Sequence, residues 1–335
     1  MSFASNCPTQ KSRNTVNDNH SSDDKNTSSS SNVPSSESFD GQSFDGKDTW
    51  VKCISTSGTL RGVAVRITGI TRELAGLQKL SPAGSEALGE ALLSGLLLAS
   101  FSKVGERINL NVRSSGGVRQ ALVDAYPEGK VRGYVIETPD TAVTDYSKTG
   151  PWGEGTLSVL RTKEMERQQP YIGTVPLITG HLAKDLTFYW LQSEQVPSAV
   201  GLSIMMGEDG EVASAGGFIV QALPGASEKE IDDIQRHVEA LGGAAGAVAA
   251  QGDPVQLLSK IFQDHAFFVL EEKELHWECN CSWERVDRAL SLIGKEEVER
   301  LLVEGQAEVN CDFCTKSYIA GTERLEAILN RITAN

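Results

Sequence analysis

The sequence predicts an α+β protein: an N-terminal, mostly antiparallel sheet with helices, a helical linker, and a small C-terminal zinc domain with four cysteine ligands. Several short alternating or β-branched runs occur for each helical segment, without the strict strand–helix alternation of a doubly wound fold. A charged stretch with narrow apolar stripes comes next. Four of the six cysteines then cluster near the C-terminus, which indicates a metal site in that part of the chain.

Composition excludes several classes of protein. The 335 residues are 39% hydrophobic and 23% charged, which is enough apolar content for a real core and excludes fibrous or wholly disordered chains. The longest strongly apolar run, Ala91–Phe101, is shorter than the roughly 18 residues that a membrane span needs, so we expect no membrane insertion. A net charge of −14 argues against a nucleic-acid partner, because phosphate binding needs a basic surface.

The beginning of the chain bears on the compartment. Its first residues contain no apolar segment of the kind found in secretory signals, so a reducing compartment is expected. Lys11 and Arg13 precede the first acidic residue, which is a hint of an organellar transit peptide. Acidic residues recur from Asp18 onward, and transit peptides avoid them, so a cytoplasmic location is favoured.

The chain divides into four parts. Residues 1–48 form a serine-rich tail with almost no apolar side chains, and such a segment is expected to be disordered. Residues 49–226 form the main domain, 227–275 a marginally stable helical linker, and 276–335 the zinc domain.

In the main domain, Ser81 and Pro82 are expected to begin a helix, and a second helix is expected over 181–191. The first helix has apolar residues on one face: Leu88, Leu92, Leu96 and Ala99. Strands are expected at residues 63–67, 108–112, 131–136, 157–160, 201–206 and 217–223.

The linker contains two short helices with thin apolar faces. Ser227 and Glu230 form a capping box at the start of the first helix, and Asp253 with Pro254 starts the second. Their apolar stripes consist of Ile231, Ile234, Val238 and Leu241, then Val255, Leu258 and Ile261. Such helices are stable only when they pack against another part of the protein. Residues 227–273 are therefore expected to act as a latch over the main domain, close to the balance between docked and released.

The four clustered cysteines have the spacing of a metal site. Cys279 and Cys281 form a C-x-C pair, and Cys311 and Cys314 form a C-x-x-C pair 29 residues later. Two close pairs of thiolates supply the tetrahedral ligand set that structural Zn²⁺ sites need, so one zinc ion per chain is expected. Without the metal, a unit of about 60 residues with so small a core would be marginally stable.

Two short helices are expected between the cysteine pairs. Ser282 is a suitable N-cap for the first helix, and Gly294 ends it. The apolar face of this helix consists of Val286, Leu290 and Ile293. The second helix is expected over residues 295–303.

No catalytic motif is supported. His276 and Glu278 match the H-x-E half of a zinc deaminase, but Asn310 stands where such enzymes have a proline before the second cysteine pair. Four cysteine ligands would also leave no open position for a catalytic water. Phosphate-binding glycine loops and a nucleophile elbow are absent from the sequence, so we expect no enzymatic activity.

Other cysteines and histidines are isolated in the sequence. Cys7 and Cys53 have no nearby partner, and both are expected to be bystanders in the redox chemistry. The remaining histidines are expected to be ordinary structural or surface residues: His20, His181, His237 and His265.

The cysteine region resembles the redox-switch domain of the thirty-three-kilodalton redox-regulated heat-shock chaperones. The resemblance rests on Cys279–Arg285 (CNCSWER), then Ala289–Leu290, Val309–Cys314 (VNCDFC) and Tyr318. Further segments resemble that family in the same order: Arg132–Tyr134 (RGY), Gly173–Leu177 (GTVPL), Ser193–Pro197 (SEQVP), Gly216–Phe218 (GGF) and Gln221–Gly225 (QALPG). The resemblance covers about residues 50–330, and the N-terminal tail departs from the family pattern.

The resemblance implies an ATP-independent holdase chaperone. In that family the reduced, zinc-loaded protein is an inactive monomer. Oxidation forms two disulfides, which here would pair Cys279 with Cys281 and Cys311 with Cys314. It releases zinc, unfolds the switch domain and linker, and exposes apolar surface. The active form, typically a homodimer, holds unfolded or partly folded client proteins until an ATP-dependent foldase takes them.

The alternative from another class is a structural zinc module on a protein-interaction adaptor. A zinc ribbon that binds nucleic acid ranks third, because the acidic charge disfavours it. Zinc loss on mild oxidation, together with a gain in anti-aggregation activity, distinguishes the chaperone from both.

Overall fold

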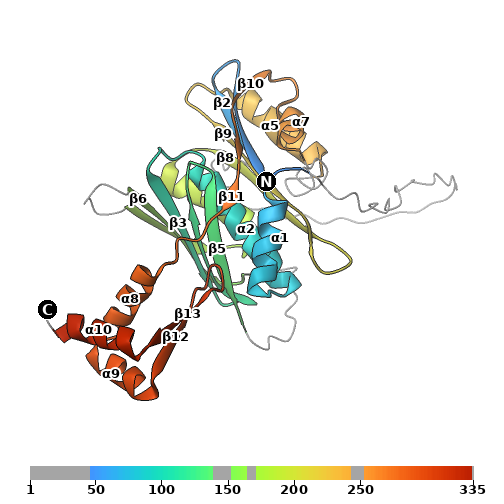
Figure 1. Cartoon of the computed structure of the whole chain (residues 1–335). Helices are drawn as coiled ribbons and strands as arrows, with labels where there is room; N and C mark the ends of the chain where they lie inside the picture. Colours follow the sequence, from blue (N-terminus) through green and yellow to red (C-terminus); the bar gives the residue numbers. More distant parts are fainter. Residues whose placement is uncertain (1–45, 139–151, 164–170, 243–252, 334–335) are drawn as a thin grey trace, which may run out of the picture.

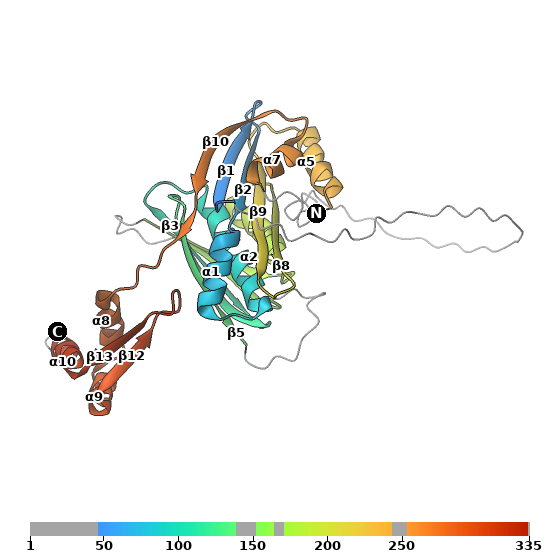
Figure 2. The ribbon, with the colours of Figure 1, turned by 45° about the vertical axis from the view of Figure 1, so that its right-hand side comes forward.

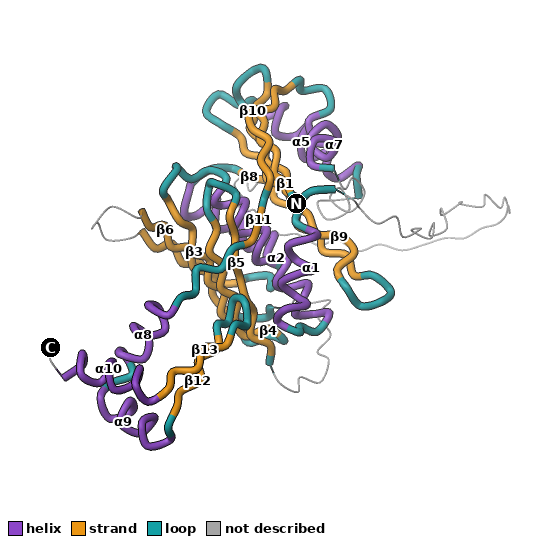
Figure 3. Tube along the Cα trace, viewed as in Figure 1, coloured by secondary structure: helices purple, strands orange, loops and turns teal. Residues whose placement is uncertain are grey.

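The computed structural model describes residues 46–138, 152–163, 171–242 and 253–333 (Figure 1). These residues form two large sheets, a two-stranded hairpin sheet, and helices that lie between and around them (Figure 3). Most of the tail expected over residues 1–48, Cys7 included, lies outside the described residues. So does most of the stretch between the two linker helices.

Two sheets make up the body of the protein. The first contains β1 (Thr49–Ser55), β2 (Leu60–Arg66), β8 (Ser198–Met206), β9 (Val212–Ala222) and β10 (Phe267–Glu274). Its strand order is β10-β1-β2-β9-β8, and all its pairs are antiparallel. The second contains β3 (Glu106–Ser114), β4 (Val118–Ala125), β5 (Lys130–Glu137), β6 (Gly155–Lys163), β7 (Tyr171–Leu177) and β11 (His276–Trp277). Its order is β11-β5-β4-β3-β6-β7, and only the short β11 pairs in parallel, with β5.

The helices fall into three groups. Helices α1 (Thr68–Gln78), α2 (Pro82–Ala99) and α4 (Leu182–Tyr189), followed by the π-helical turn η1 (Trp190–Glu194), belong to the main domain. Helices α5 (Glu228–Ala240) and α7 (Pro254–Phe262) lie in the linker. The C-terminal unit contains α8 (Trp283–Leu292), α9 (Lys295–Glu304), β12 (Gln306–Asn310), β13 (Ser317–Gly321) and α10 (Thr322–Thr333). This unit projects from the body beside β5 (Figures 1 and 2).

The predicted α+β class and its mostly antiparallel sheets are confirmed. Each of the six expected strands overlaps an observed strand, although residues 67 and 223 lie just outside β2 and β9. The helices expected after Ser81, Ser227, Asp253 and Ser282 begin there, and the helix expected over 181–191 forms α4 and part of η1. The expectation of a helical linker up to residue 275 is wrong for residues 267–274, which form β10 at the edge of the first sheet. The charged second half of this strand, residues 271–274, is typical in sequence of a solvent-exposed helix. In the sheet, however, its backbone pairs with β1, and Glu271 forms an ion pair with Lys52 (Nζ to Oε2, 2.6 Å).

Helix α2 lies between the two sheets (Figure 2). Ser81 caps it, because its Oγ accepts a hydrogen bond from the Gly84 amide, as the sequence predicted. The expectation of a single apolar face was too narrow, since Leu93, Leu97 and Leu98 are as fully buried as the predicted stripe. A helix that is apolar all round needs partners on every side, and two sheets provide them.

The linker helices cover the outer face of the first sheet. Ile234 and Val238 of α5, and Leu258 and Ile261 of α7, are buried there, while Ile231 and Leu241 are half-buried. The sheet side of this second core consists of Val51, Cys53, Leu60, Ala64, Phe218, Val220 and Ala222. Val255, expected on the apolar stripe, is exposed, and Leu257 and Phe262 are buried instead. The predicted capping box at Ser227 and Glu230 is present.

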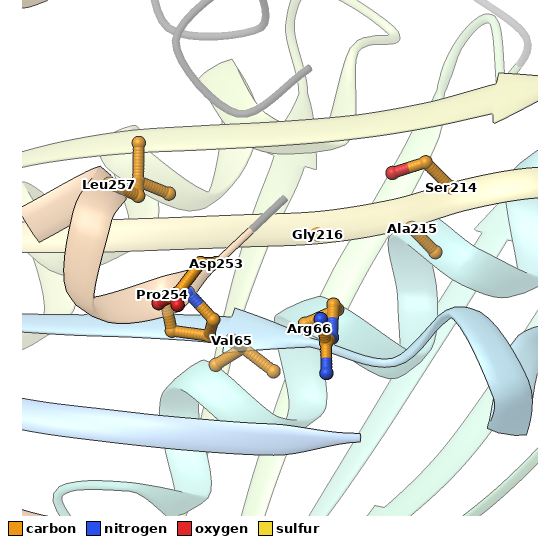
Figure 4. A pocket seen from close by; sticks show the side chains of 8 residues that line it. All are labelled: Val65, Arg66, Ser214, Ala215, Gly216, Asp253, Pro254 and Leu257. Atoms are coloured by element: carbon orange, nitrogen blue, oxygen red, sulfur yellow. The ribbon is translucent and has the colours of Figure 1, made fainter. Parts of the chain in front are cut away.

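The first turn of α7 sits over a small hollow in the sheet (Figure 4). Asp253 and Pro254 lie on one side of it, and β2 and β9 form the floor. Asp253 Oδ1 accepts hydrogen bonds from the amides of Val255 and Gln256, so the helix begins with its N-cap at the edge of the hollow. The side chains of α7 therefore pack on the first sheet but leave this hollow beneath the N-terminal end of the helix.

A buried carboxyl group in α2 makes the stability of the main domain dependent on pH. The pKa of Glu90 is raised to about 7, chiefly by burial; the hydrogen bond from Trp152 Nε1 (2.9 Å) lowers it, and the nearby carboxylates of Glu86 and Asp185 raise it. A raised pKa in the folded state means that stability is lost as pH rises from about 4.5 through about 7. Glu90→Gln should therefore become more stable relative to the parent by about 2–3 kcal/mol between pH 5 and pH 8.

Urea unfolding at the two pH values measures this difference. Glu211→Gln, an exposed carboxyl replaced in the same way, is the control and should show no such trend. An equal effect of Glu90→Gln at both pH values would contradict the assignment.

Candidate metal centre

The structure brings the four clustered cysteines together. Cys279 and Cys281 lie on the segment between β11 and α8, and Cys311 and Cys314 lie in the turn between β12 and β13. The four Sγ atoms lie within 4.8 Å of one another. Among the described residues, no other group of three or more His, Cys, Asp or Glu side chains converges in this way.

Local backbone structure holds each pair in place. The β12–β13 hairpin brings Asn310 opposite Ser317, and the turn is closed by hydrogen bonds from the Cys311 amide to the Lys316 carbonyl (3.0 Å) and from the Thr315 amide to the Cys311 carbonyl (2.8 Å). On the other side, Ser282 caps α8 directly after Cys281, as predicted. Both pairs are therefore fixed by regular elements that begin or end beside them.

The sulfur positions fit a tetrahedral metal ion. Cys279 Sγ lies 3.6 Å from Cys311 Sγ, and Cys281 Sγ lies 3.5 Å from Cys314 Sγ. Four sulfurs about 2.3 Å from a central ion are roughly 3.8 Å apart, which is close to these two separations. All four cysteines are free thiols, and each is half-buried. This group can hold one metal ion, and sulfur ligands favour zinc or another thiophilic metal.

The thiols do not ionise equally. Burial opposes ionisation of Cys281, but a hydrogen bond from Tyr318 Oη (3.2 Å) and the neighbouring thiols lower its pKa to about 7. Burial raises the pKa of Cys279 and of Cys314. Cys281 therefore becomes a thiolate, the form that binds metals and reacts with oxidants, at lower pH than Cys279 and Cys314.

Tyr318 connects the cluster to the core of the C-terminal unit. Its side chain is buried, and its ring packs edge-on against Trp283, with 5.0 Å between centroids. The Arg324 guanidinium lies over the Trp283 ring, 4.0 Å from its centroid. Its Nε and Nη2 also donate hydrogen bonds to the two carboxylate oxygens of Asp287. The donor to Cys281 is therefore positioned by packing and by charge.

The other predicted residues lie elsewhere, and two contributors were missed. Cys53 is fully buried in β1 below α7, where burial raises its pKa to about 12. His276 is exposed in β11. In the linker, His237 Nδ1 bonds to the Ile261 carbonyl (3.0 Å). Sequence analysis placed both Tyr318 and Phe313 in the family motif but assigned neither a role, because their contacts are with residues of other elements.

Comparison with known proteins identifies the family. The model of the family described as Hsp33 protein matches residues 48–320. The chain belongs to the Hsp33 family. It is 35% identical to a 33 kDa chaperonin of Geobacter sulfurreducens over 292 residues, which are 86% of this chain and 96% of that protein. A 33 kDa chaperonin of Latilactobacillus sakei is 34% identical over 290 residues, 84% of this chain and 99% of the relative.

A solved Hsp33 structure has the same fold. The crystal structure of a 33 kDa chaperonin from Thermotoga maritima superposes with a TM-score of 0.77 at 28% identity, covering 87% of this chain and all of that one. Membership of the Hsp33 family confirms the prediction of a chaperone that binds client proteins and is not an enzyme. In the part of the chain that the structure describes, no helix is long and apolar enough to cross a membrane.

Removing the Tyr318 hydroxyl should weaken metal binding. Tyr318→Phe keeps the ring against Trp283 but loses the hydrogen bond to Cys281, and loss of such an outer contact typically costs about 10-fold or more in metal affinity. Co²⁺ titration of the reduced protein measures the affinity through the thiolate charge-transfer bands. Ser317→Ala, which removes a hydroxyl that bonds to Glu308 on the same hairpin, should leave the affinity unchanged. Equal affinities for the parent and Tyr318→Phe would show that the contact has no effect on the metal.

Proposed function

We propose that this protein is a redox-regulated, ATP-independent holdase whose switch is one Zn²⁺ bound by Cys279, Cys281, Cys311 and Cys314. The observation that carries the proposal is the convergence of these four sulfurs in a chain of the Hsp33 chaperone family. In this proposal residues 49–226 bind clients, residues 227–275 regulate access to them, and residues 276–335 sense the oxidant.

Oxidation would dismantle the ligand set. Each pair of thiolates gives two electrons to one molecule of peroxide, and two protons from solvent complete the two waters that form as the disulfide bond closes. If Cys279 joins Cys281 and Cys311 joins Cys314, the two close contacts that now connect one pair to the other are both lost. A disulfide sulfur is a poor metal ligand, because metal binding requires the thiolate. The metal is therefore released.

The C-terminal unit depends on its metal because its core is small. The core contains eight buried side chains: Val286, Leu290, Val298, Ala307, Tyr318, Ala320, Leu325 and Ile328. Cys281 packs against this core, so the metal ligands and the apolar contacts support each other. Zinc binding in structural sites contributes on the order of 10–16 kcal/mol, more than such a core supplies. Loss of the metal should unfold the unit.

Unfolding would reach the latch through β10. This strand connects α7 to β11 and the first cysteine pair, and it is held to the body by its pairing with β1. If β10 loosens, α7 and α5 lose their attachment on one side, and the apolar face below them becomes accessible. An exposed apolar face of this kind binds unfolded chains. We propose that this face, with Phe218 and Val220 at its centre, takes part in client binding.

The wider cycle follows from the same proposal. The reduced form is monomeric and the oxidised form is a homodimer, and bound clients pass to an ATP-dependent foldase. The protein works in the cytoplasm, where thiols stay reduced until oxidative stress occurs.

Zinc content and activity should change together on oxidation. Freshly reduced protein should contain about one zinc per chain, and peroxide should release it while the protein gains the ability to suppress aggregation of a heat-denatured client. Zinc quantification, free-thiol counting and light scattering on the same samples measure this. A Cys7→Ser, Cys53→Ala variant should switch normally, since neither residue belongs to the cluster. Less than about half an equivalent of zinc in the reduced parent would contradict the proposal, and zinc loss without a gain in activity would favour the adaptor.

A charge on the buried stripe of α5 should open the latch without oxidant. Ile234 is fully buried against the first sheet, and a carboxylate at this position is expected to destabilise the docked state by about 3 kcal/mol or more. Ile234→Asp should then suppress client aggregation while zinc stays bound. Val255→Asp makes the same kind of change at an exposed position in α7 and is the matched control.

Alkylation of Cys53 reports opening of the latch directly. This thiol is buried below α7 and protected in the docked state, so peptide mapping after alkylation should show faster labelling in Ile234→Asp than in Val255→Asp. If Ile234→Asp stayed folded, zinc-loaded, inactive and as slowly labelled as its control, the latch would play no part in the regulation.

A further inference from the structure

One aromatic side chain connects the cysteine turn to the main domain. Phe313 lies between Cys311 and Cys314, in a turn whose neighbouring side chains Asp312 and Thr315 are exposed. The Phe313 ring is half-buried, because it leaves the C-terminal unit and packs on β5 of the second sheet. The tip of the β12–β13 hairpin lies beside β5 (Figure 1).

The ring has two partners on β5. The Arg132 guanidinium lies 4.2 Å from the centroid of the Phe313 ring, and the Tyr134 ring meets it edge-on at 5.0 Å with an interplanar angle of 87°. Both geometries are attractive ones for aromatic rings. Residues 132 and 134 are two positions apart in the strand, so their side chains project from the same face of the sheet.

Arg132 is held in place from below. Its Nε and Nη2 donate hydrogen bonds to Asp124 Oδ2 at 2.9 and 2.6 Å, and both side chains are buried. The Gln78 side chain of α1 contacts the backbone of both parts: its Nε2 donates to the Gly133 carbonyl (2.9 Å) and to the Phe313 carbonyl (3.5 Å). The surface that receives Phe313 is therefore held by contacts within the main domain.

The first cysteine pair is attached to the same strand. The amides of His276 and Glu278 donate to the Gly129 and Val131 carbonyls at the start of β5, each at 3.1 Å. These bonds lie in the chain that leads into Cys279 and do not depend on the cysteine turn. Strand β5 thus holds the C-terminal unit at two points. The first is β11, which is joined directly to β10 of the body along the chain. The second is Phe313, at the tip of the β12–β13 hairpin.

We infer that Phe313 is a metal-dependent clamp that holds the C-terminal unit on β5 and communicates the state of the cysteine centre to the main domain. The inference rests on the proposed zinc site. Phe313 can meet Arg132 and Tyr134 only while Cys311 and Cys314 keep the turn in its ligating shape. When that shape is lost the ring withdraws, and the unit remains attached through β11 alone. Strand β10, next to β11 in the chain, then loses a restraint on its end.

Nuclear magnetic resonance of the reduced, full-length protein tests the clamp. In the zinc-loaded parent, ¹⁵N relaxation should give one rotational correlation time for both parts, and the Arg132 Nε–H resonance should carry a ring-current shift from Phe313. In Phe313→Ala the zinc content should stay near one equivalent. The correlation time of residues 279–333 should fall to about half that of the main domain, and the Arg132 shift should disappear. Chelation of zinc from the parent should remove the same shift.

Two further variants make the test decisive. Ile319→Ala removes an exposed apolar side chain from β13 of the same unit and should behave as the parent does. Arg132→Lys keeps the positive charge beside Asp124 but loses the planar guanidinium over the Phe313 ring. The rate of zinc transfer to a chelator should increase about tenfold in this variant. This variant lies outside the C-terminal unit, so it decides the question if Phe313→Ala fails to retain zinc.

The outcomes separate the clamp from the proposed function. A parent that holds no zinc would overturn both. A zinc-loaded parent whose Phe313→Ala variant tumbles as one body, or whose Arg132 resonance is unaffected by zinc removal, would overturn the clamp alone. Arg132→Lys with unchanged zinc transfer would do the same.

Discussion

The convergence of four sulfur atoms at one point is the interaction on which the C-terminal unit depends. Two segments separated by 29 residues meet there, and the helices and hairpin of the unit form a core of eight buried side chains. Thiols placed this close repel one another as thiolates unless a cation lies between them. In the proposed function, the group that would stabilise the unit by holding a metal is therefore also the group that an oxidant would change.

The body of the protein is built in the opposite way. Its main core surrounds α2, which is buried on all sides between two sheets and needs no metal. The second core, between the first sheet and helices α5 and α7, is smaller and is covered by a part of the chain that leads directly to the cysteines. The buried cores thus become smaller along the chain, from the sheet-and-helix body, through the helical cover, to the C-terminal unit. In the proposed function, this order would let the cover open while the body remains folded.

Strand β5 is where these levels meet. One face contributes Val131 and Val135 to the main core, and the other presents Arg132 and Tyr134 to Phe313 of the cysteine turn. The buried ion pair between Arg132 and Asp124 fixes the receiving surface. A short aromatic contact can act as a sensitive connection here, because its energy is small compared with the metal site on one side and the main core on the other.

Much of the architecture follows from the sequence alone. Caps at Ser81, Ser227 and Ser282 set helix starts, because a hydroxyl beside the first free amides acts within one turn of chain. The spacing of the four cysteines predicted a group that can hold a metal, because two closely spaced pairs of thiolates are the usual ligands of a tetrahedral structural zinc ion. These features are local or chemically specific, so they are visible without the fold.

Tertiary structure decided the rest. The apolar stripe of α2 could not show that both sheets would bury the helix, and Phe267–Glu274 became a strand because β1 offers it an edge. Tyr318 acquires its role from Cys281, 37 residues away, and Phe313 from Arg132 on another domain. Contacts between residues distant in the chain depend on where whole elements pack, and no local propensity encodes that. The sequence by itself determined which residues can hold the metal; only the fold decided what the state of that site is connected to.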